Sequence, residues 1–221
     1  MSASSSVQTG TRAVIFDLDG VLVWTIPMHW WAFRQTFLEE GKDFSYEDYM
    51  ERAVGASRDQ VIRNVLGDHL PPSRLEQLMA SKGRYVEEYV REKGVDTIPG
   101  AMDFVRSVRA RGLKTAVASA SRTPRFLLES VDAAGLFDAI VDRTMVEESK
   151  PQPDLFLLCA KMLEVQPSEC VVIEDSDVGV EAAVRAGMRV LALTTTHDRS
   201  DLGKANSIYR SYADIPLSDW L

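Results

Sequence analysis

The stretch Ala13-Val-Ile-Phe-Asp-Leu-Asp-Gly20 decides which fold is expected for this chain. Its first four residues form a continuous apolar run rich in β-branched residues, which is typical of a strand buried on both faces of a parallel sheet. The run stops at Asp17, and a second carboxylate follows at Asp19. Open α/β sheets bind their ligands beyond the carboxyl ends of the strands. We therefore expect a buried strand that presents two carboxylates at the ligand-binding edge of a sheet.

Four more short apolar runs predict further strands, at residues 115–118, 139–141, 170–173 and 189–193. Helical patterns occupy residues 102–111, 124–134, 154–163 and 179–186. Strands that alternate with helices of about ten residues indicate βαβ units. The sequence therefore predicts a doubly wound, Rossmann-like α/β core built on a parallel sheet.

Residues 27–93 interrupt this alternation, because they contain helical patterns and turns but no strand pattern. The block follows the carboxyl end of the first strand, so we expect an inserted all-helical cap domain over the site. The predicted divisions are a disordered Ser-rich tail at residues 1–10, a core at 11–24 and 96–221, and a cap at 25–95.

Composition narrows the classes of function. The 221 residues are 45% hydrophobic, which is an ordinary share for a globular protein. The net charge of −8 disfavours a nucleic-acid backbone or an anionic membrane surface as partner. Cys159 and Cys170 form no C-x-x-C pair, which argues against a zinc site and for a reducing compartment. No apolar run approaches the roughly 20 residues of a membrane span, and the leader lacks a signal-peptide pattern. We expect a cytoplasmic protein.

Polar groups follow the predicted strands where ligands should bind. Asp17 and Asp19 follow the first strand, Ser119 follows the second, and Glu174 and Asp175 follow the fourth. Carboxylates gathered on one rim repel one another unless a hard cation neutralises them, and oxygen ligands with room for water and phosphate favour Mg²⁺. The pattern predicts a magnesium site.

Phosphoryl transfer needs a nucleophile, an acid/base and positive charge on the transferring oxygens. An Asp can serve as nucleophile and form an aspartyl-phosphate. Lys150 can place a positive charge on the phosphate. The Ser119 hydroxyl and the backbone N–H of Ala120 can donate hydrogen bonds to the phosphate oxygens. The residues at the strand ends therefore indicate a phosphoryl-transfer enzyme.

The residues at the strand ends lie in four segments, Phe16-Asp-Leu-Asp-Gly-Val-Leu22, Ala118-Ser-Ala-Ser-Arg122, Ser149-Lys-Pro-Gln-Pro-Asp154 and Ile173-Glu-Asp-Ser-Asp-Val-Gly179. In this order the segments resemble the four motifs of the haloacid dehalogenase (HAD) superfamily. The chain is most similar to the β-phosphoglucomutase-like branch, whose helical cap sits at the same place in the sequence. The resemblance implies that Asp17 is the nucleophile and Asp19 the acid/base. It implies Mg²⁺ held by Asp17, the Asp19 carbonyl, Asp175 and Glu174, with Ser119 and Lys150 on the phosphate.

The same resemblance implies substrate contacts in the cap. His29 and the Gly55-Ala-Ser-Arg58 segment match the β-phosphoglucomutase pattern, in which the Arg clamps the non-reacting phosphate. A bidentate guanidinium suits that task. The alternative is that His29 is only a surface or capping residue and that Arg58 makes no substrate contact.

Three positions depart from the pattern of the branch. Trp24, Val54 and Val61 stand where relatives carry Asp, Lys and Ser, and we expect all three at or near the sugar-facing surface. A buried sugar hydroxyl without a partner loses roughly 1–3 kcal/mol. The departures predict a substrate other than β-glucose 1-phosphate, or a different pose of it.

The preferred function is a Mg²⁺-dependent phosphatase that hydrolyses a small phosphorylated metabolite, with a sugar phosphate favoured, as a monomer or weak dimer. The first alternative is a β-phosphoglucomutase, in which the phosphoryl group passes to a second sugar hydroxyl instead of to water. A dehalogenase fits the acids less well. From another class, the alternative is a catalytically silent binding domain that has kept the fold.

Overall fold

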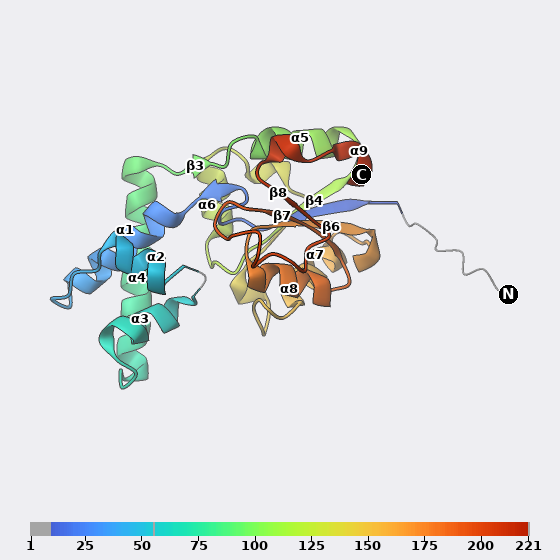
Figure 1. The fold of residues 1–221 in the computed structure, drawn as a ribbon. Coiled ribbons are helices and arrows are strands. Elements are labelled where there is room, and N and C mark those ends of the chain that lie inside the picture. Colours follow the sequence, from blue (N-terminus) through green and yellow to red (C-terminus); the bar gives the residue numbers. More distant parts are fainter. Residues whose placement is uncertain (1–9, 55, 221) are drawn as a thin grey trace. The chain divides into compact units, whose positions relative to one another are not determined.

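A computed structural model describes residues 10–54 and 56–220 of the chain. The predicted disordered tail at residues 1–10 lies outside the described residues except for Gly10. By its internal contacts the chain divides into two units, one formed by Met1–Val23 and Thr97–Leu221 and the other by Trp24–Asp96. Figure 1 labels the helices and strands of both units.

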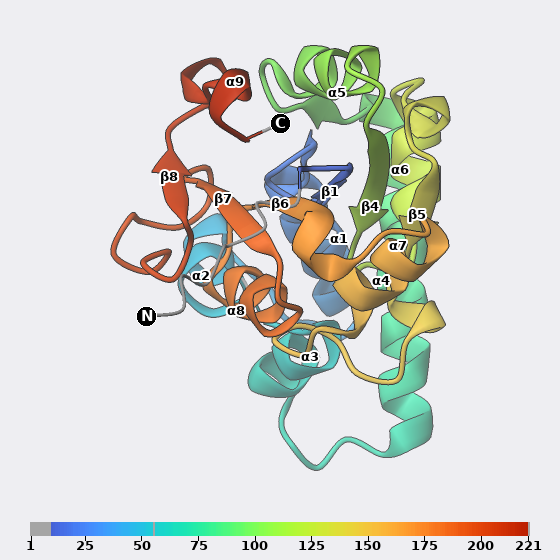
Figure 2. The same ribbon diagram turned by 90° about the vertical axis from the view of Figure 1, so that its right-hand side faces the viewer.

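The first unit is built on a parallel sheet of six strands in the order β5-β4-β1-β6-β7-β8 (Figure 2). Every neighbouring pair of this sheet is parallel. The chain builds outward from β1 through β4 to β5 and then returns to β6 on the other side of β1. The order therefore reverses at β1, which is the point at which open α/β sheets bind ligands. The strands are β1 (Ala13–Phe16), β4 (Lys114–Ala118), β5 (Ala139–Val141), β6 (Cys170–Glu174), β7 (Arg189–Leu193) and β8 (Ser207–Tyr209).

Helices cover both faces of the sheet. On one face, α7 (Asp154–Met162) and α8 (Asp177–Arg185) bury residues such as Phe156 and Val180 in one cluster with Ile15 and Val172 of the strands. On the other face, Phe104 of α5 (Ala101–Ala110) makes an edge-on ring contact with Phe16, at a centroid distance of 6.2 Å. The remaining helices of this unit are α6 (Pro124–Ser130) and α9 (Leu217–Trp220). The predicted doubly wound α/β core is confirmed.

The helix after β4 and the last strand of the sheet differ from the sequence prediction. The predicted helix at 124–134 ends at Ser130, and Asp132 then adopts a left-handed backbone conformation with φ 53° that terminates the helix. The strand β8 was not predicted, because its three residues are all half-buried and show no continuous apolar run. Such short strands are typical of sheet edges.

The second unit is an inserted helical unit. Its core contains Phe33 and Phe37 of α1 together with Tyr49, Ile62 and Leu78 from the other three helices. Its helices are α1 (Ile26–Leu38), α2 (Tyr46–Arg52), α3 (Arg58–Leu66) and α4 (Pro72–Lys93). The two-residue strands β2 (Val23–Trp24) and β3 (Asp96–Thr97) pair where the chain passes between the units. Among the described helices, none is both long enough and apolar enough to cross a membrane.

Candidate active site

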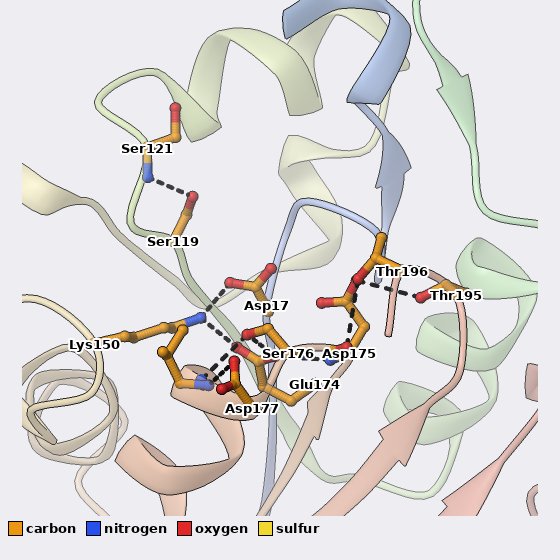
Figure 3. Close-up of polar contacts among 12 residues, drawn as sticks. Asp17, Ser119, Ser121, Lys150, Glu174, Asp175, Ser176, Asp177, Thr195 and Thr196 are labelled. Atoms are coloured by element: carbon orange, nitrogen blue, oxygen red, sulfur yellow. Dashed lines mark hydrogen bonds and ion pairs between the residues drawn. The ribbon is translucent and has the colours of Figure 1, made fainter. Parts of the chain in front are cut away.

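The central strands of the sheet bring three of the predicted site residues to one edge (Figure 3). Asp17 directly follows β1, Glu174 ends β6, and Ser119 directly follows β4. The register aligns Phe16 with both Val117 and Ile173. Neighbouring strands lie about 4.8 Å apart. Asp17 and Glu174 directly follow this row and are neighbours, and Ser119 lies one residue further along, directly after β4, at the same carboxyl edge of the sheet.

Lys150 links two of these carboxylates. Its ammonium group donates to Asp17 Oδ1 and, at 2.6 Å, to Glu174 Oε1. Only 6% of the Lys150 side chain is exposed. Burial alone lowers the pKa of this amine, but the adjacent Asp17 and Glu174 carboxylates outweigh burial and raise the pKa above its usual value. Lys150 therefore carries a permanent positive charge at the end of β1.

Both carboxylate oxygens of Glu174 accept hydrogen bonds from other groups of the protein. Its Oε2 accepts hydrogen bonds from the backbone N–H of Asp175 at 2.7 Å, the N–H of Ser176 at 2.8 Å and the Ser176 hydroxyl at 3.0 Å. Ser176 in turn caps α8 by accepting from the Gly179 N–H at 3.1 Å. Because Oε1 is held by Lys150, both oxygens of Glu174 have partners.

Asp175 is held by hydroxyl groups from the loop after β7. Thr196 Oγ1 donates to Asp175 Oδ2 at 2.5 Å, and Thr195 Oγ1 lies 3.3 Å from the same oxygen. Thr195 makes a closer bond, at 2.7 Å, to the carbonyl of Gly20. Gly20 has a positive φ of 76°, and a Cβ there would overlap the Asp175 carboxylate. The Asp19-Gly20 turn and the Asp175 carboxylate are therefore packed against each other.

The electrostatics of the site leave an excess of negative charge. Burial raises the pKa of Asp17 to about 7, against the lowering effect of Lys150 and with further raising by Glu174 and Asp19. Burial, with Glu174 and Asp17 nearby, also raises the pKa of Asp175 well above its usual value. Asp17, Glu174 and Asp175 form a buried cluster, and among the described residues the one cation paired with it is the buried side chain of Lys150. When ionised, the three carboxylates exceed this cation by two charges, which a divalent cation would balance.

The donor atoms fit a hard cation such as Mg²⁺. Among the described residues, no hydrogen bond or ion pair reaches Asp17 Oδ2 or Asp175 Oδ1, so each carboxylate has an oxygen to offer. No group of three or more His, Cys, Asp or Glu side chains in the described part of the chain has the spacing of a metal site. Two carboxylates would have to be completed by a main-chain carbonyl, water or phosphate. Mg²⁺ commonly accepts such a ligand set.

The remaining predicted residues of the first unit lie on nearby loops. Asp19 is half-buried, forms a backbone bridge with Val23 and contributes to the raised pKa of Asp17. Ser119 is fully buried, and its Oγ accepts from the Ser121 N–H at 3.0 Å (Figure 3). Ala120 is exposed between them. This turn follows β4, the neighbour of β1, and holds the buried Ser119 followed by the exposed Ala120.

The predicted substrate residues of the helical insert lie apart from this cluster in sequence. His29 of α1 has its Nδ1 2.9 Å from the ammonium of the buried Lys82, which stands 5.0 Å over the Phe33 ring. Arg58 begins α3 and donates to the Met79 carbonyl at 3.3 Å. Gly55 lies outside the described residues.

One sequence expectation about the insert is wrong. Val61 is 1% exposed and belongs to the core of the insert, so it does not lie at a substrate-facing surface. The replacement of a polar residue at this position is explained by packing. Trp24 and Val54 are half-buried against the same core and each keeps an exposed part.

Sequence reasoning missed Thr195 and Thr196. They stand in the run Thr194-Thr-Thr-His197, which directly follows the predicted strand at 189–193. The rule that led to Asp17, Ser119 and Glu174 applies equally to this strand end. Neutral hydroxyl groups did not stand out beside the charged residues.

The fold and the site together define an α/β enzyme with a charged centre at the topological switch point. The family model for haloacid dehalogenase-like hydrolases matches residues 11–187. The chain belongs to this family and is an enzyme of it. The predicted superfamily and its β-phosphoglucomutase-like branch are confirmed.

Named relatives differ in their reactions. The chain is 32% identical to the β-phosphoglucomutase of Bacillus subtilis, over 93% of this chain and 92% of that protein. It is 33% identical to a fructose-1-phosphate phosphatase of Escherichia coli, over 79% of this chain and 92% of that protein. The structure of CbbY from Rhodobacter sphaeroides in complex with xylulose-(1,5)bisphosphate superposes with a TM-score of 0.83 at 26% identity, covering 95% of this chain and 99% of that chain. A catalytically silent domain, the alternative of another class, has no support among these relatives.

Proposed function

We propose that this protein is a Mg²⁺-dependent phosphatase that hydrolyses a small sugar phosphate through a phosphorylated Asp17. The observation that carries the proposal is the contact of Lys150 with Asp17 Oδ1, beside the buried Glu174 and Asp175. A lysine paired with the nucleophile can also attract the dianionic phosphate and stabilise charge on its oxygens. The relatives that act on sugar phosphates support this class of substrate.

The Mg²⁺ ion would be held by the carboxylates of Asp17 and Asp175 and the main-chain carbonyl of Asp19, and it would supply positive charge for the transferring oxygens. We assign Glu174 to anchoring Lys150, because both Glu174 oxygens already have protein partners. The Ser119 hydroxyl and the Ala120 N–H would donate to the phosphate oxygens.

In the first step, a carboxylate oxygen of Asp17 attacks phosphorus, and the bond from phosphorus to the sugar oxygen breaks. Asp19 donates a proton to the departing sugar oxygen. In the second step, Asp19 takes a proton from a water molecule whose oxygen attacks the phosphorus of the aspartyl-phosphate. The bond from phosphorus to Asp17 breaks, which releases phosphate and restores both carboxyl groups.

We further propose that the insert Trp24–Asp96 selects the substrate as a cap, with His29, Gly55 and Arg58 as contacts. The chain enters the insert directly after the loop that carries Asp17 and Asp19. Closure of such an insert would exclude water and orient the ester, and its opening would release the product. The apolar Trp24 and Val54 favour a substrate with fewer hydroxyl groups to satisfy at these two positions.

The test is a panel of phosphate esters with Mg²⁺ and detection of inorganic phosphate, including sugar monophosphates and bisphosphates. We expect turnover that is strongest on sugar phosphates and is absent in the Asp17→Asn variant. Full activity of Asp17→Asn at saturating ester would remove Asp17 as nucleophile. Absence of turnover across the panel by the wild-type protein would remove the phosphatase proposal.

The second candidate is a β-phosphoglucomutase, favoured by the similarity to the Bacillus subtilis enzyme over nearly the whole chain. β-Glucose 1-phosphate separates the two candidates. A phosphatase releases inorganic phosphate, whereas a mutase forms glucose 6-phosphate. Stoichiometric isomerisation without phosphate release would favour the mutase.

A further inference from the structure

The loop after β7 contributes side chains that contact the candidate metal site from outside the four sequence motifs. Thr196 Oγ1 donates to Asp175 Oδ2 at 2.5 Å (Figure 3). Thr195 Oγ1 donates to the Gly20 carbonyl at 2.7 Å. All of these atoms belong to the same unit. The two hydroxyl groups thus reach a carboxylate and a turn that carry separate parts of the site.

The bond from Thr196 selects between the two oxygens of Asp175. An ionised carboxylate only accepts hydrogen bonds, so the single hydroxyl proton of Thr196 has to point at Oδ2. Among the described residues, no hydrogen bond reaches Oδ1. Asp175 is 3% exposed, and a Cβ at Gly20 would lie 2.8 Å from Thr196 Cγ2. The carboxylate is therefore fixed in rotation, with one oxygen bound and the other offered.

Thr195 acts on the adjacent turn. Its one proton serves the Gly20 carbonyl, because that oxygen is closer than Asp175 Oδ2, at 2.7 Å against 3.3 Å. The peptide between Gly20 and Val21 is thereby held against the loop that also holds Asp175. The Asp19 carbonyl belongs to the peptide that directly precedes this one in the chain.

We propose that Thr196 is a positioning residue for Mg²⁺, which orients Asp175 so that Oδ1 faces the ion, and that Thr195 supports it by fixing the Asp19-Gly20 turn. The inference rests on the proposed function in taking Asp175 as a metal ligand. Partners that hydrogen-bond to a metal ligand typically change metal affinity by about 10–100-fold when removed.

The test is calorimetric titration of Mg²⁺ into the whole protein without substrate. We expect Thr196→Val, which keeps the shape but removes the donor, to raise the dissociation constant by about 10–100-fold. Thr196→Ser keeps the hydroxyl and should bind close to the wild type. Thr194→Val is the matched control, since the Thr194 side chain has no hydrogen bond among the described residues and lies in the same loop.

A second readout separates positioning from general damage. In the ester assay, Thr196→Val should need more Mg²⁺ for half-maximal rate while kcat at saturating Mg²⁺ stays near the wild-type value. If Thr196→Val does not fold, Thr196→Ala removes the same bond and is titrated in its place. Wild-type affinity in the variant that lacks the hydroxyl overturns the proposal, and so does equal weakening in Thr196→Ser.

The inference and the proposed function can fail separately. If the wild type binds Mg²⁺ and Thr196→Val binds it weakly, the inference holds even when no ester is hydrolysed. If esters are hydrolysed but the hydroxyl does not affect Mg²⁺ binding, the phosphatase proposal holds and the role of Thr196 is rejected. A wild type that binds no Mg²⁺ rejects the inference directly.

Discussion

Gly179 lies directly against the carboxylate of Glu174, so closely that a Cβ at Gly179 would overlap Oε1 and Cδ of that side chain. The glycine is in the first turn of α8, where an Ala would ordinarily favour the helix by about 1 kcal/mol. Glu174 cannot move aside without losing its bonds to Lys150 and to the backbone of Asp175 and Ser176.

We therefore predict that Gly179→Ala lowers the free energy of unfolding by about 1–3 kcal/mol, despite the better helix propensity of Ala. Ester hydrolysis should fall with it, because Glu174 anchors Lys150. Urea unfolding and initial rates measure the two effects. Gly135→Ala is the control, since a Cβ there meets nothing within 4 Å. A stable, fully active Gly179→Ala would contradict the role given to Glu174.

Lys150 provides the second prediction. Its ammonium pairs with Asp17 and Glu174 in a site where it is 6% exposed, so Lys150→Met leaves two buried carboxylates without their cation. Removal of one partner from a buried ion pair costs about 3–5 kcal/mol. We expect a loss of this size in urea unfolding with a chelator present, together with loss of hydrolysis. The exposed Lys161 of α7 is the control, and Lys161→Met should leave both quantities unchanged.

Asp138 gives a prediction for acid stability. Burial acts to raise its pKa, but the Thr115 N–H at 2.8 Å and the Arg109 guanidinium at 3.0 Å together lower the pKa below the usual value of 3.8. A carboxyl group whose pKa is lower in the folded chain than in the unfolded chain stabilises the folded state at pH values above its unfolded pKa. This stabilisation is lost as the pH falls through the pKa of the group in the folded state. Asp138→Asn should therefore be less stable than the wild type at pH 7, by about 1 kcal/mol or less for such an exposed pair.

The difference between wild type and Asp138→Asn should shrink as urea unfolding is repeated toward about pH 3, where the wild-type carboxyl is protonated in the unfolded chain. A difference that is constant from pH 7 to pH 3 would show that packing, not charge, is responsible. Asp103→Asn is the control, since the Asp103 side chain is 88% exposed.

Much of the site could be predicted because strand ends of a parallel sheet share one edge. Asp17, Ser119 and Glu174 each follow or end an apolar run, and apolar runs are visible in a sequence. The contact between Lys150 and Glu174 could not be predicted in this way, because it depends on the path of the loop between β5 and α7. The charge of Lys150 and the motif resemblance predicted its role on the phosphate, and the structure added its contacts with Asp17 and Glu174.

The errors have separate physical reasons. The burial of Val61 depends on which face of α3 turns toward the core, and alignment with relatives does not give the helix phase. The strand β8 is an edge strand that owes its pairing to β7 and not to its own apolar content. Thr196 carries no charge, so its importance follows only from its distance to Asp175.

The cysteines provide the fourth prediction. Both are fully buried and free, and burial raises the pKa of Cys170 to about 12, with Glu169 adding to the effect. Burial also raises the pKa of Cys159 far above its usual range. Because the thiolate is the reactive form, neither thiol should react with a disulfide reagent at about pH 8 in the native protein. Two thiols per chain should react once the protein is unfolded in denaturant. Rapid native reaction at either site would mean that the core opens locally.

The last prediction concerns the proton on His197. Thr196 Oγ1 lies 2.9 Å from His197 Nδ1 and gives its only proton to Asp175 Oδ2. The oxygen of Thr196 can then only accept from the ring, so Nδ1 has to carry the proton in the neutral imidazole. Long-range ¹H–¹⁵N correlation spectra with Mg²⁺, recorded at a pH where the ring nitrogens themselves report a neutral imidazole, should show the Nδ1–H tautomer. In Thr196→Val the ring loses this partner, and the spectrum should shift toward the Nε2–H form. An Nε2–H tautomer in the wild type would mean that the Thr196 proton points at His197, and Asp175 would then lack the bond that orients it.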